Sequence, residues 1–271
     1  MSAPRRIRVG AVNYLNTKPL IHGLAERAPQ AELVLDLPSR LAMRLAAGDL
    51  DVALIPSIEC FGDPTYSIVS DACIACQGPV LSVKLFSRVS PESIRTLALD
   101  EGSRTSAALV QILLDERFGI RPALAPLPIG DSLAQTDADA VLLIGDRAIH
   151  SPCEPFTAVW DLGDEWCRWA ELPFVFALWT ARAGVDLDGL DVALAEARDL
   201  GLQNLDKIAT HEAAPLGLTQ PECLAYLRDN LHFTFGPRER RGLARFYELA
   251  AARALAPQGV DLALDDCTPS R

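Results

Sequence analysis

The stretch IRVGAVNYLNTKPL, residues 7–20, decides how the fold of the chain is predicted. Its first six residues alternate between apolar and polar side chains, which predicts a β-strand. A polar turn follows, and a helix is predicted to begin near Asn16 or Thr17. Pro19 falls in the first turn of that helix, where its missing N–H group costs nothing. The stretch therefore predicts a strand that ends in a polar turn and leads into a helix.

The alternation of strand and helix continues beyond this stretch to residue 57. Such a β-α-β-α-β pattern is typical of a parallel sheet covered by helices. Three short β-rich runs within residues 66–86 interrupt the pattern, which returns over residues 96–144. A further strand is predicted at residues 173–181, and the chain after residue 188 is predicted to be helical.

These elements predict an α/β protein with two lobes. Lobe 1 comprises residues 1–87 and is completed by residues 180–271, whose helices pack on it. Lobe 2 comprises residues 88–179, and the chain is expected to cross between the lobes near residues 87–91 and 179–183. Because discontinuous lobes of this kind usually bind a small molecule between them, we expect a ligand cleft at their junction.

The composition excludes several classes of protein. Of the 271 residues, 49% are hydrophobic, which is enough for a packed core and excludes a disordered chain. Lys and Arg number 25 against 36 Asp and Glu, and the net charge of −11 argues against a nucleic-acid partner. No stretch approaches the roughly 18 apolar residues that would span a bilayer, so no membrane partner is expected.

The sequence predicts a cytoplasmic protein with free thiols. The N-terminal residues lack the apolar segment and the cleavage site of a signal peptide. Seven cysteines, an odd number, do not indicate a disulfide framework. Cys73 and Cys76 form a C-x-x-C pair, but no second pair with suitable spacing completes a zinc site, so structural cysteines are favoured. The P-loop, G-x-G-x-x-G and G-x-S-x-G motifs are missing too, and no metal or organic cofactor is predicted.

Polar residues follow several of the predicted strands, at the sheet edge where ligands usually bind. Ser, Thr and Asn at the N-terminus of a helix lie beside N–H groups that can hold carboxylates or phosphates. Arg104 adds a guanidinium that can bind a carboxylate through two hydrogen bonds. Together these residues predict an anion-accepting cleft, although each turn alone could be a purely structural cap. The residues that follow the predicted strands are Asn13, Tyr14, Asn16, Thr17, Ser57, Gly102, Ser103, Arg104, Thr105, Ser106, Gly145 and Asp146.

Several blocks of the sequence resemble, in the same order, the chorismate dehydratases of the futalosine route of menaquinone biosynthesis. Each block is weak alone, but the ordered set is specific. The blocks span residues 7–180, whereas the helices after residue 188 match only in general character. They are VGAVNYLNTKPL (residues 9–20), GDLDVALIPSIE (48–59), GPVLS (78–82), SRTS (103–106), LIGD (143–146) and LPFVFALW (172–179).

The resemblance implies a type II periplasmic-binding-protein-like fold with the ligand cleft between its lobes. It also implies a lyase that dehydrates chorismate to 3-[(1-carboxyvinyl)oxy]benzoate. Asn16 matches the family's important asparagine and Ser82 matches the serine of its G-P-V-x-S block, so these two are the predicted catalytic residues. The residues predicted to bind the substrate are Ser57, Ser103, Arg104, Thr105, Ser106, Gly145 and Asp146.

The predicted site contains no obvious general base. Chorismate carries two carboxylates, and losing the proton on its ether-bearing ring carbon together with the adjacent hydroxyl yields a benzene ring. We therefore expect the enolpyruvyl carboxylate of the substrate to act as the base, while the protein binds both anions and fixes the reactive conformer. For Asp146 three roles stay open: a part in the chemistry, orientation of Arg104, or a helix cap.

Two other functions are compatible with such a fold. One is a non-catalytic binding protein for a small carboxylate, against which the missing secretion signal and DNA-binding segment argue. The other is the sister enzyme that makes 1,4-dihydroxy-6-naphthoate, against which the block LNTKPL (residues 15–20) argues. The sequence leaves the oligomeric state open.

Overall fold

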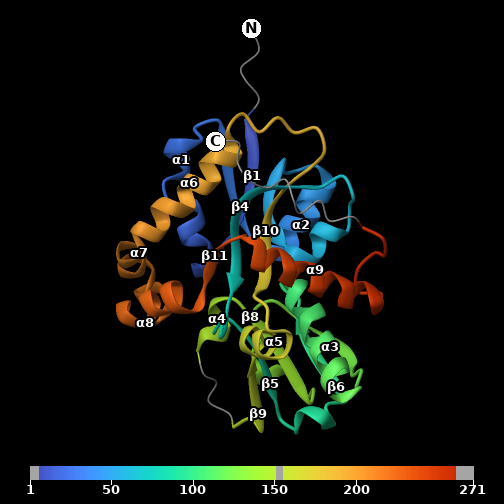
Figure 1. Ribbon diagram of the computed structural model, residues 1–271. Helices are drawn as coiled ribbons and strands as arrows, with labels where there is room; N and C mark the ends of the chain where they lie inside the picture. Colours follow the sequence, from blue (N-terminus) through green and yellow to red (C-terminus); the bar gives the residue numbers. More distant parts are fainter. Residues whose placement is uncertain (1–5, 151–154, 261–271) are drawn as a thin grey trace.

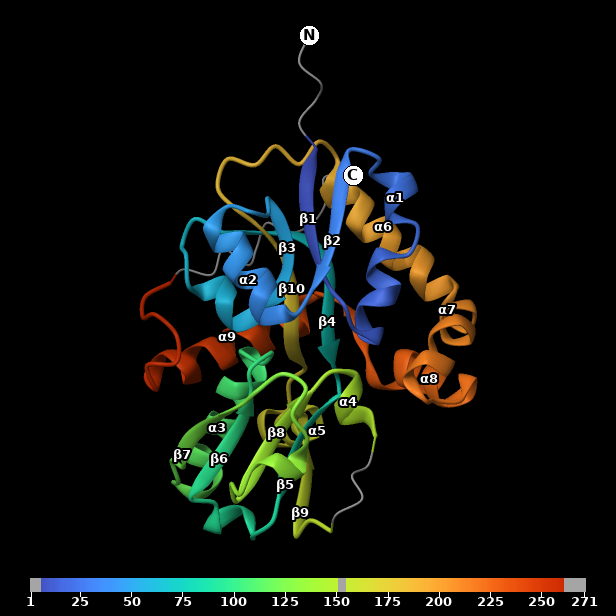
Figure 2. The same ribbon diagram turned by 180° about the vertical axis from the view of Figure 1, so that it is seen from behind.

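The computed structural model describes residues 6–150 and 155–260, and the strands in this part of the chain form two sheets covered by helices (Figure 1). The first sheet has six strands in the order β11-β4-β10-β3-β1-β2, and the second has five in the order β7-β6-β8-β5-β9. Figure 2 shows the two sheets as an upper and a lower lobe. The two α/β lobes predicted from the sequence are therefore confirmed.

The two sheets and their helices are built from the following segments of the chain. The strands are β1 (Ile7–Val12), β2 (Ala31–Asp36), β3 (Val52–Pro56), β4 (Ser67–Cys76), β5 (Val83–Ser87), β6 (Thr96–Asp100), β7 (Ala123–Leu127), β8 (Ala140–Ile144), β9 (Ala158–Asp161), β10 (Phe174–Ala181) and β11 (His232–Thr234). The α-helices are α1 (Leu24–Arg27), α2 (Pro38–Ala47), α3 (Thr105–Phe118), α4 (Asp146–Ile149), α5 (Leu162–Ala170), α6 (Leu190–Gln203), α7 (Leu205–Glu212), α8 (Gln220–Ala225) and α9 (Pro237–Ala252). The 3₁₀ helices are η1 (Leu15–Ile21), η2 (Ser57–Phe61), η3 (Pro91–Ser93), η4 (Leu133–Gln135) and η5 (Ala214–Leu216), and η6 (Tyr226–Asn230) is a π-helical segment.

Most of the strand predictions are confirmed. β1 pairs in parallel with β2 and with β3, as the β-α-β-α-β pattern predicts. Two of the short β-rich runs, residues 66–69 and 72–76, belong to the single strand β4, because Ser70 and Asp71 between them continue the extended backbone. The chain after residue 188 is not entirely helical, since it contributes β11 to the first sheet.

The helix predicted near Asn16 is a 3₁₀ helix, η1, and the short α1 follows it. The N–H of Thr17 donates to the carbonyl oxygen of Tyr14 at 3.1 Å, the spacing of a 3₁₀ turn. Pro19 lies inside η1 and has no N–H group to extend an α-helical hydrogen-bond pattern. The tight turn keeps Asn16 close to the end of β1.

The chain crosses between the sheets earlier than the sequence suggests. β5 is hydrogen-bonded to β8 and β9 in the second sheet, so the first crossing lies at residues 77–82 rather than 87–91. β10 pairs with β3 and β4 in the first sheet, so the return lies at residues 171–173 rather than 179–183. Both strands carry apolar residues on both faces, and such a strand suits either sheet equally well. The hydrophobic pattern therefore does not reveal which sheet a strand joins.

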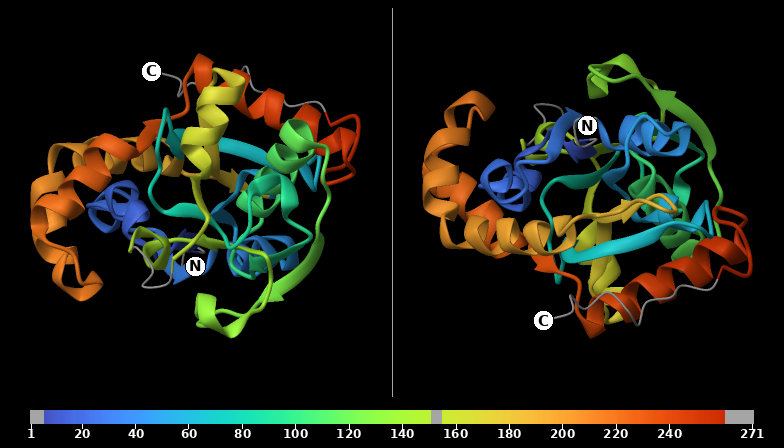
Figure 3. Two further views of the ribbon diagram at one scale, coloured as in Figure 1. Left: turned by 90° about the horizontal axis from the view of Figure 1, so that it is seen from below. Right: turned by 90° about the horizontal axis from the view of Figure 1, so that it is seen from above.

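One hydrophobic core extends through the junction of the lobes. The ring of Trp166 on α5 packs edge-on against Phe174 of β10, with 5.2 Å between the ring centroids. Trp166 also packs against Phe246 on α9, at 6.2 Å. In Figure 1, α9 runs along the level where the lobes meet, whereas α6 to α8 gather on another flank of the molecule in Figure 3. The C-terminal helices therefore cover the first sheet and also contact the second lobe.

Gly201 allows α6 to contact the backbone of η1. A Cβ atom at this position would lie 2.0 Å from the carbonyl oxygen of Pro19. Since η1 also carries Asn16, the position of Asn16 depends on this close approach.

We expect the substitution Gly201→Ala to lower the free energy of unfolding by about 1–3 kcal/mol, because the added methyl group must displace η1. Without that contact, alanine would stabilise a helix relative to glycine by up to about 1 kcal/mol. The sign of the change, measured by urea unfolding, therefore tests the contact. An equally stable or more stable variant would contradict it.

Candidate functional site

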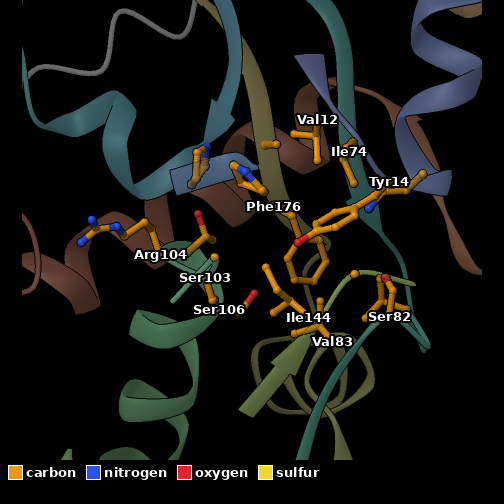
Figure 4. Close-up of a pocket in the computed structure, with 18 residues that line it drawn as sticks. Val12, Tyr14, Ile74, Ser82, Val83, Ser103, Arg104, Ser106, Ile144 and Phe176 are labelled. Atoms are coloured by element: carbon orange, nitrogen blue, oxygen red, sulfur yellow. The ribbon is translucent and has the colours of Figure 1, made fainter. Parts of the chain in front are cut away.

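A cavity lies between the two sheets, where β1, β3, β6 and β8 end (Figure 4). A cleft between two lobes is a usual position for a small-molecule site. The lining residues are Val12, Tyr14, Asn16, Pro38, Pro56, Ile74, Val80, Ser82, Val83, Gly102, Ser103, Arg104, Thr105, Ser106, Ile144, Gly145, Phe176 and Ala177. The predicted site residues Asn16, Ser82, Ser103, Arg104, Thr105, Ser106 and Gly145 are among them, whereas Ser57 and Asp146 are not.

One end of the cavity is formed by the first turn of α3. No side chain caps this helix, and its first intrahelical hydrogen bond is donated by the N–H of Ala108 to the carbonyl oxygen of Arg104. The N–H groups before Ala108 therefore have no partner within the helix. The hydroxyl of Ser103 is buried and also has no hydrogen-bond partner. These donors and the helix dipole make this end suitable for a carboxylate.

Arg104 lies at the same end, with its side chain half exposed. Its Nε atom lies 3.8 Å from Oε1 of Glu59. The charged partner of Arg104 is therefore Glu59 and not Asp146, which one of the three open roles for Asp146 had required. A pair this exposed and this long holds the guanidinium only weakly. Arg104 is therefore free to turn toward an anion in the cavity.

Ser82 lies across the cavity from Ser103 and Arg104, with Tyr14 and Ile144 between them (Figure 4). Asn16 and Ser82 line the same cavity, and both side chains lie beside the hydroxyl of Tyr226.

The hydroxyl of Thr17 donates to Oδ1 of Asn16 at 3.3 Å. This bond leaves the amide NH₂ group of Asn16 available as a donor. The second end of the cavity is therefore lined by a serine hydroxyl and a carboxamide, which are neutral.

A strained turn places Ser82 in the cavity. The N–H of Ser82 donates to the carbonyl oxygen of Val80 at 2.7 Å, which closes a γ-turn around Leu81 with φ of +59°. The carboxylate of Asp161 accepts the N–H groups of Val80 and Leu81 at 2.9 and 2.6 Å, and it also caps α5. Backbone strain of this kind is concentrated at functional sites. One carboxylate thus fixes both α5 and the crossing segment that carries Ser82.

The middle of the cavity is apolar. The ring of Tyr14 packs directly on Gly145, where an added Cβ atom would lie 2.7 to 2.9 Å from the ring carbons. Gly145 has φ of +72°, so its position requires glycine for both reasons. Burial and the negative charge of Asp100 raise the pKa of Tyr14 to about 12. The phenol of Tyr14 is therefore neutral at physiological pH.

No carboxylate, imidazole, amine or thiol lines the cavity in the part of the chain that the structure describes. The carboxylates of Asp100 and Asp146 line a neighbouring cavity that shares Tyr14 with this one. Asp100 is paired with Arg147, at 2.5 Å between Oδ2 and Nη2. The lining residues therefore offer donors and one guanidinium but no conventional general base.

Ser57 and Asp146 connect the lobes instead of lining the cavity. Ser57 is fully buried and donates to the carbonyl oxygen of Val175 in its own lobe at 2.7 Å, while its Oγ lies 3.4 Å from Oγ1 of Thr105 in the other lobe. Its neighbour in the chain, Ile58, donates its N–H to Oγ1 of Thr105 across the lobes at 3.2 Å. Asp146 accepts the N–H of Leu15 at 3.0 Å, also across the lobes. Both residues therefore hold the two walls of the cavity together.

The substitution Asp146→Asn tests whether the charge of this residue matters. Burial raises the pKa of Asp146, so the native state binds its proton more tightly than the unfolded chain does. At neutral pH the buried charge therefore costs stability, while asparagine retains an oxygen that can accept the N–H of Leu15. We expect the variant to be at least as stable as the wild type at pH 7.

The stability difference should shrink as the pH falls through the raised pKa, because the wild-type carboxyl then becomes neutral. Thermal unfolding of both proteins across the pH range measures this difference. A variant that is clearly less stable at pH 7 would mean that the charge of Asp146 stabilises the closed lobes.

Among residues 6–150 and 155–260, no group of three or more His, Cys, Asp or Glu side chains is placed to hold a metal ion. The helices in these ranges are too short or too polar to cross a membrane. Cys73 and Cys76 are both buried in β4.

Sequence reasoning did not identify Asp161 as part of the site. It is the last residue of β9, a strand that the sequence analysis did not predict, and its partners Val80 and Leu81 lie some 80 positions earlier in the chain. An aspartate at the start of an amphipathic helix indicates a helix cap, which Asp161 is. Its second role depends on tertiary contacts that no local pattern indicates.

Comparisons with known proteins show similarities in sequence and in fold. A family model described as "Menaquinone biosynthesis" matches residues 7–252. A protein named chorismate dehydratase, from Thermus thermophilus, is 32% identical over 258 residues, which cover 89% of this chain and 93% of that protein.

Solved structures with lower sequence identity share the fold. A protein from Archaeoglobus fulgidus has a TM-score of 0.74 at 16% identity, covering 94% of this chain and 100% of its own. The periplasmic aliphatic sulphonate binding protein SsuA from Escherichia coli has a TM-score of 0.62 at 17% identity, with 96% of each chain covered. The periplasmic-binding-protein-like fold that the sequence predicts is therefore confirmed.

Proposed function

This chain belongs to the menaquinone-biosynthesis family, and from that premise we propose that it is a lyase that dehydrates chorismate. The product is 3-[(1-carboxyvinyl)oxy]benzoate, with water as the second product. Membership of the family and the relative named chorismate dehydratase support the reaction. The assignment of residues to steps rests on the geometry of the cavity.

The ring carboxylate of chorismate binds at the α3 end of the cavity. The free N–H groups of the first turn and the hydroxyl of Ser103 donate to it, and the guanidinium of Arg104 turns inward to pair with it. This carboxylate is conjugated with the ring, so negative charge grows on it when the ring loses a proton. Donors already aimed at that charge lower the barrier to deprotonation.

The enolpyruvyl carboxylate lies at the other end, beside Asn16 and Ser82. The amide of Asn16 orients this carboxylate over the hydrogen of the ether-bearing ring carbon, and Ser82 donates a hydrogen bond next to it. The carboxylate removes that proton, and the C–O bond to the adjacent hydroxyl then breaks. The hydroxyl takes up the proton and departs as water, leaving an aromatic ring. Positioning of the substrate's own base replaces a protein base.

The walls of the cavity come from both lobes, and Thr105 contributes to holding them closed. Its Oγ1 accepts the N–H of Ile58, while Asp146 accepts the N–H of Leu15. Ser57, which is buried behind the cavity wall, places its Oγ 3.4 Å from Oγ1 of Thr105. Closure of this kind removes water, which strengthens each hydrogen bond to the substrate.

The observation that carries the proposal is a cavity with donors at two opposite ends and no described base between them. The reaction needs this arrangement, because the substrate has two anions and supplies its own base. A conventional acid–base enzyme would need a titratable side chain at the reacting carbon.

The test is to incubate the purified protein with chorismate in metal-free buffer and to follow the rise of a benzenoid absorbance. Mass spectrometry should show a product that has lost one water. Binding of chorismate without conversion would favour the non-catalytic binding protein instead. Conversion only of the precursor of 1,4-dihydroxy-6-naphthoate would favour the sister enzyme. The cytoplasmic location stays a prediction.

A further inference from the structure

Tyr226 carries a buried hydroxyl that completes no well-aligned hydrogen bond, although the side chains of Ser82 and Asn16 lie beside it. Its side chain is 1% exposed. A buried O–H group without a partner is unfavourable, so native proteins rarely keep one without a reason. Tyr226 also begins η6, a π-helical segment, and such segments occur frequently at functional sites.

The hydroxyl of Tyr226 faces the end of the cavity that holds the predicted catalytic residues. Ser82 and Asn16 are the neutral side chains beside it, and the carboxylates of Asp146 and Asp161 act on it through their charge. Asn230, at the far end of η6, donates its Nδ2 hydrogen to the carbonyl oxygen of Pro79 at 3.0 Å. The π-helical segment is therefore tied to the same crossing segment that carries Ser82.

Of the two neutral neighbours, Ser82 is the better acceptor. Oδ1 of Asn16 already accepts a hydrogen bond from the hydroxyl of Thr17 at 3.3 Å. Burial raises the pKa of Tyr226 well above its ordinary value, so the group is a neutral donor at physiological pH. A serine hydroxyl that accepts one hydrogen bond has its own O–H free to point elsewhere.

We propose that Tyr226 is a positioning residue for the dehydration, an inference that rests on the proposed function. When the substrate is bound, the hydroxyl of Tyr226 donates to Oγ of Ser82. This bond turns the O–H of Ser82 toward the substrate and holds it there. Tyr226 itself does not touch the substrate, since it does not line the cavity.

The variant Tyr226→Phe removes only the hydroxyl and keeps the ring in the core. We expect kcat for chorismate to fall about 10- to 100-fold, as for other residues that orient a functional group, with KM unchanged. The melting temperature should stay the same or rise, because the variant loses a buried hydroxyl that completes no well-aligned hydrogen bond. A purely structural hydroxyl would lower the melting temperature and leave kcat intact.

Tyr247→Phe is the matched control. The hydroxyl of Tyr247 donates to the carbonyl oxygen of Pro257 at 2.9 Å and accepts the N–H of Val260 at 2.7 Å. It therefore has two structural partners and lies outside the lining of the cavity. We expect this variant to lose stability and to retain kcat, the reverse of Tyr226→Phe.

A double-mutant cycle separates positioning from an independent effect. If Tyr226 acts through Ser82, then adding Tyr226→Phe to Ser82→Ala should cause no further loss of kcat. If the loss of kcat in the double variant equals the product of the two single losses, the inference is overturned. Wild-type kcat in Tyr226→Phe would overturn it as well while leaving the proposed function intact. A wild-type protein that does not convert chorismate overturns both.

Discussion

Replacing Asn16 by alanine should lower kcat for chorismate at least about 100-fold, the loss that follows removal of a single preorganised amide donor from an active site. Asn16 lines the cavity, and the bond from Thr17 to its Oδ1 leaves the NH₂ group as the donor. Without that donor the enolpyruvyl carboxylate is no longer held over the ring hydrogen. The variant should fold normally, because the lost side chain faces a cavity.

Asn13→Ala is the control for this variant. Asn13 is exposed, lies in the same turn after β1 and does not line the cavity. We expect it to keep the wild-type kcat, as measured by the absorbance of the benzenoid product. If Asn16→Ala is fully active at saturating chorismate, then Asn16 takes no part in the chemistry and only lines the cavity.

Much of the fold could be predicted because its signals are local. The largely apolar run in residues 7–12 and the turn after it identify β1, and the repeated strand–helix pattern identifies a parallel sheet. The crossings between the sheets could not be located, since β5 and β10 carry apolar residues on both faces. Which sheet such a strand joins depends on partners that are distant in the sequence.

The candidate site also has residues that local sequence patterns predict and residues that depend on distant contacts. Asn16 and the run from Ser103 to Ser106 could be predicted because they follow β1 and β6, one strand in each sheet, and ligands bind beyond the carboxyl ends of such strands. Ser82 was predicted only through the family resemblance, since the γ-turn that presents it has no local sequence signature. Asp161 and Tyr226 look like a helix cap and a core aromatic residue, and their contacts with the crossing segment and with Ser82 are tertiary.

The absence of a base in the described lining predicts how the reaction responds to pH. Arg104 and Tyr14 are the titratable side chains in that lining, and the pKa of Tyr14 is raised to about 12. Tyr14 therefore stays neutral throughout the physiological range. We expect kcat to be flat from about pH 6 to pH 9, because a substrate carboxylate gains its proton only well below this range.

Removing the base from the substrate should lower kcat much more than a change of pH within this range does. A chorismate analogue whose enolpyruvyl carboxylate is a neutral carboxamide keeps the ring carboxylate for the α3 end but cannot accept the ring proton. We expect its kcat at saturation to be lower by about 10²- to 10⁴-fold, the contribution of a positioned general base. Its binding, measured by competition with chorismate, should weaken much less. If the analogue instead reacts at the normal rate, then a residue of the protein removes the proton. The same conclusion follows if the pH profile of kcat has a limb near neutral pH that disappears on substitution of one protein side chain.

The Asn16→Ala variant links the two experiments. It should slow the reaction of chorismate greatly and that of the carboxamide hardly at all, because an amide that orients a base has no effect once the base is gone.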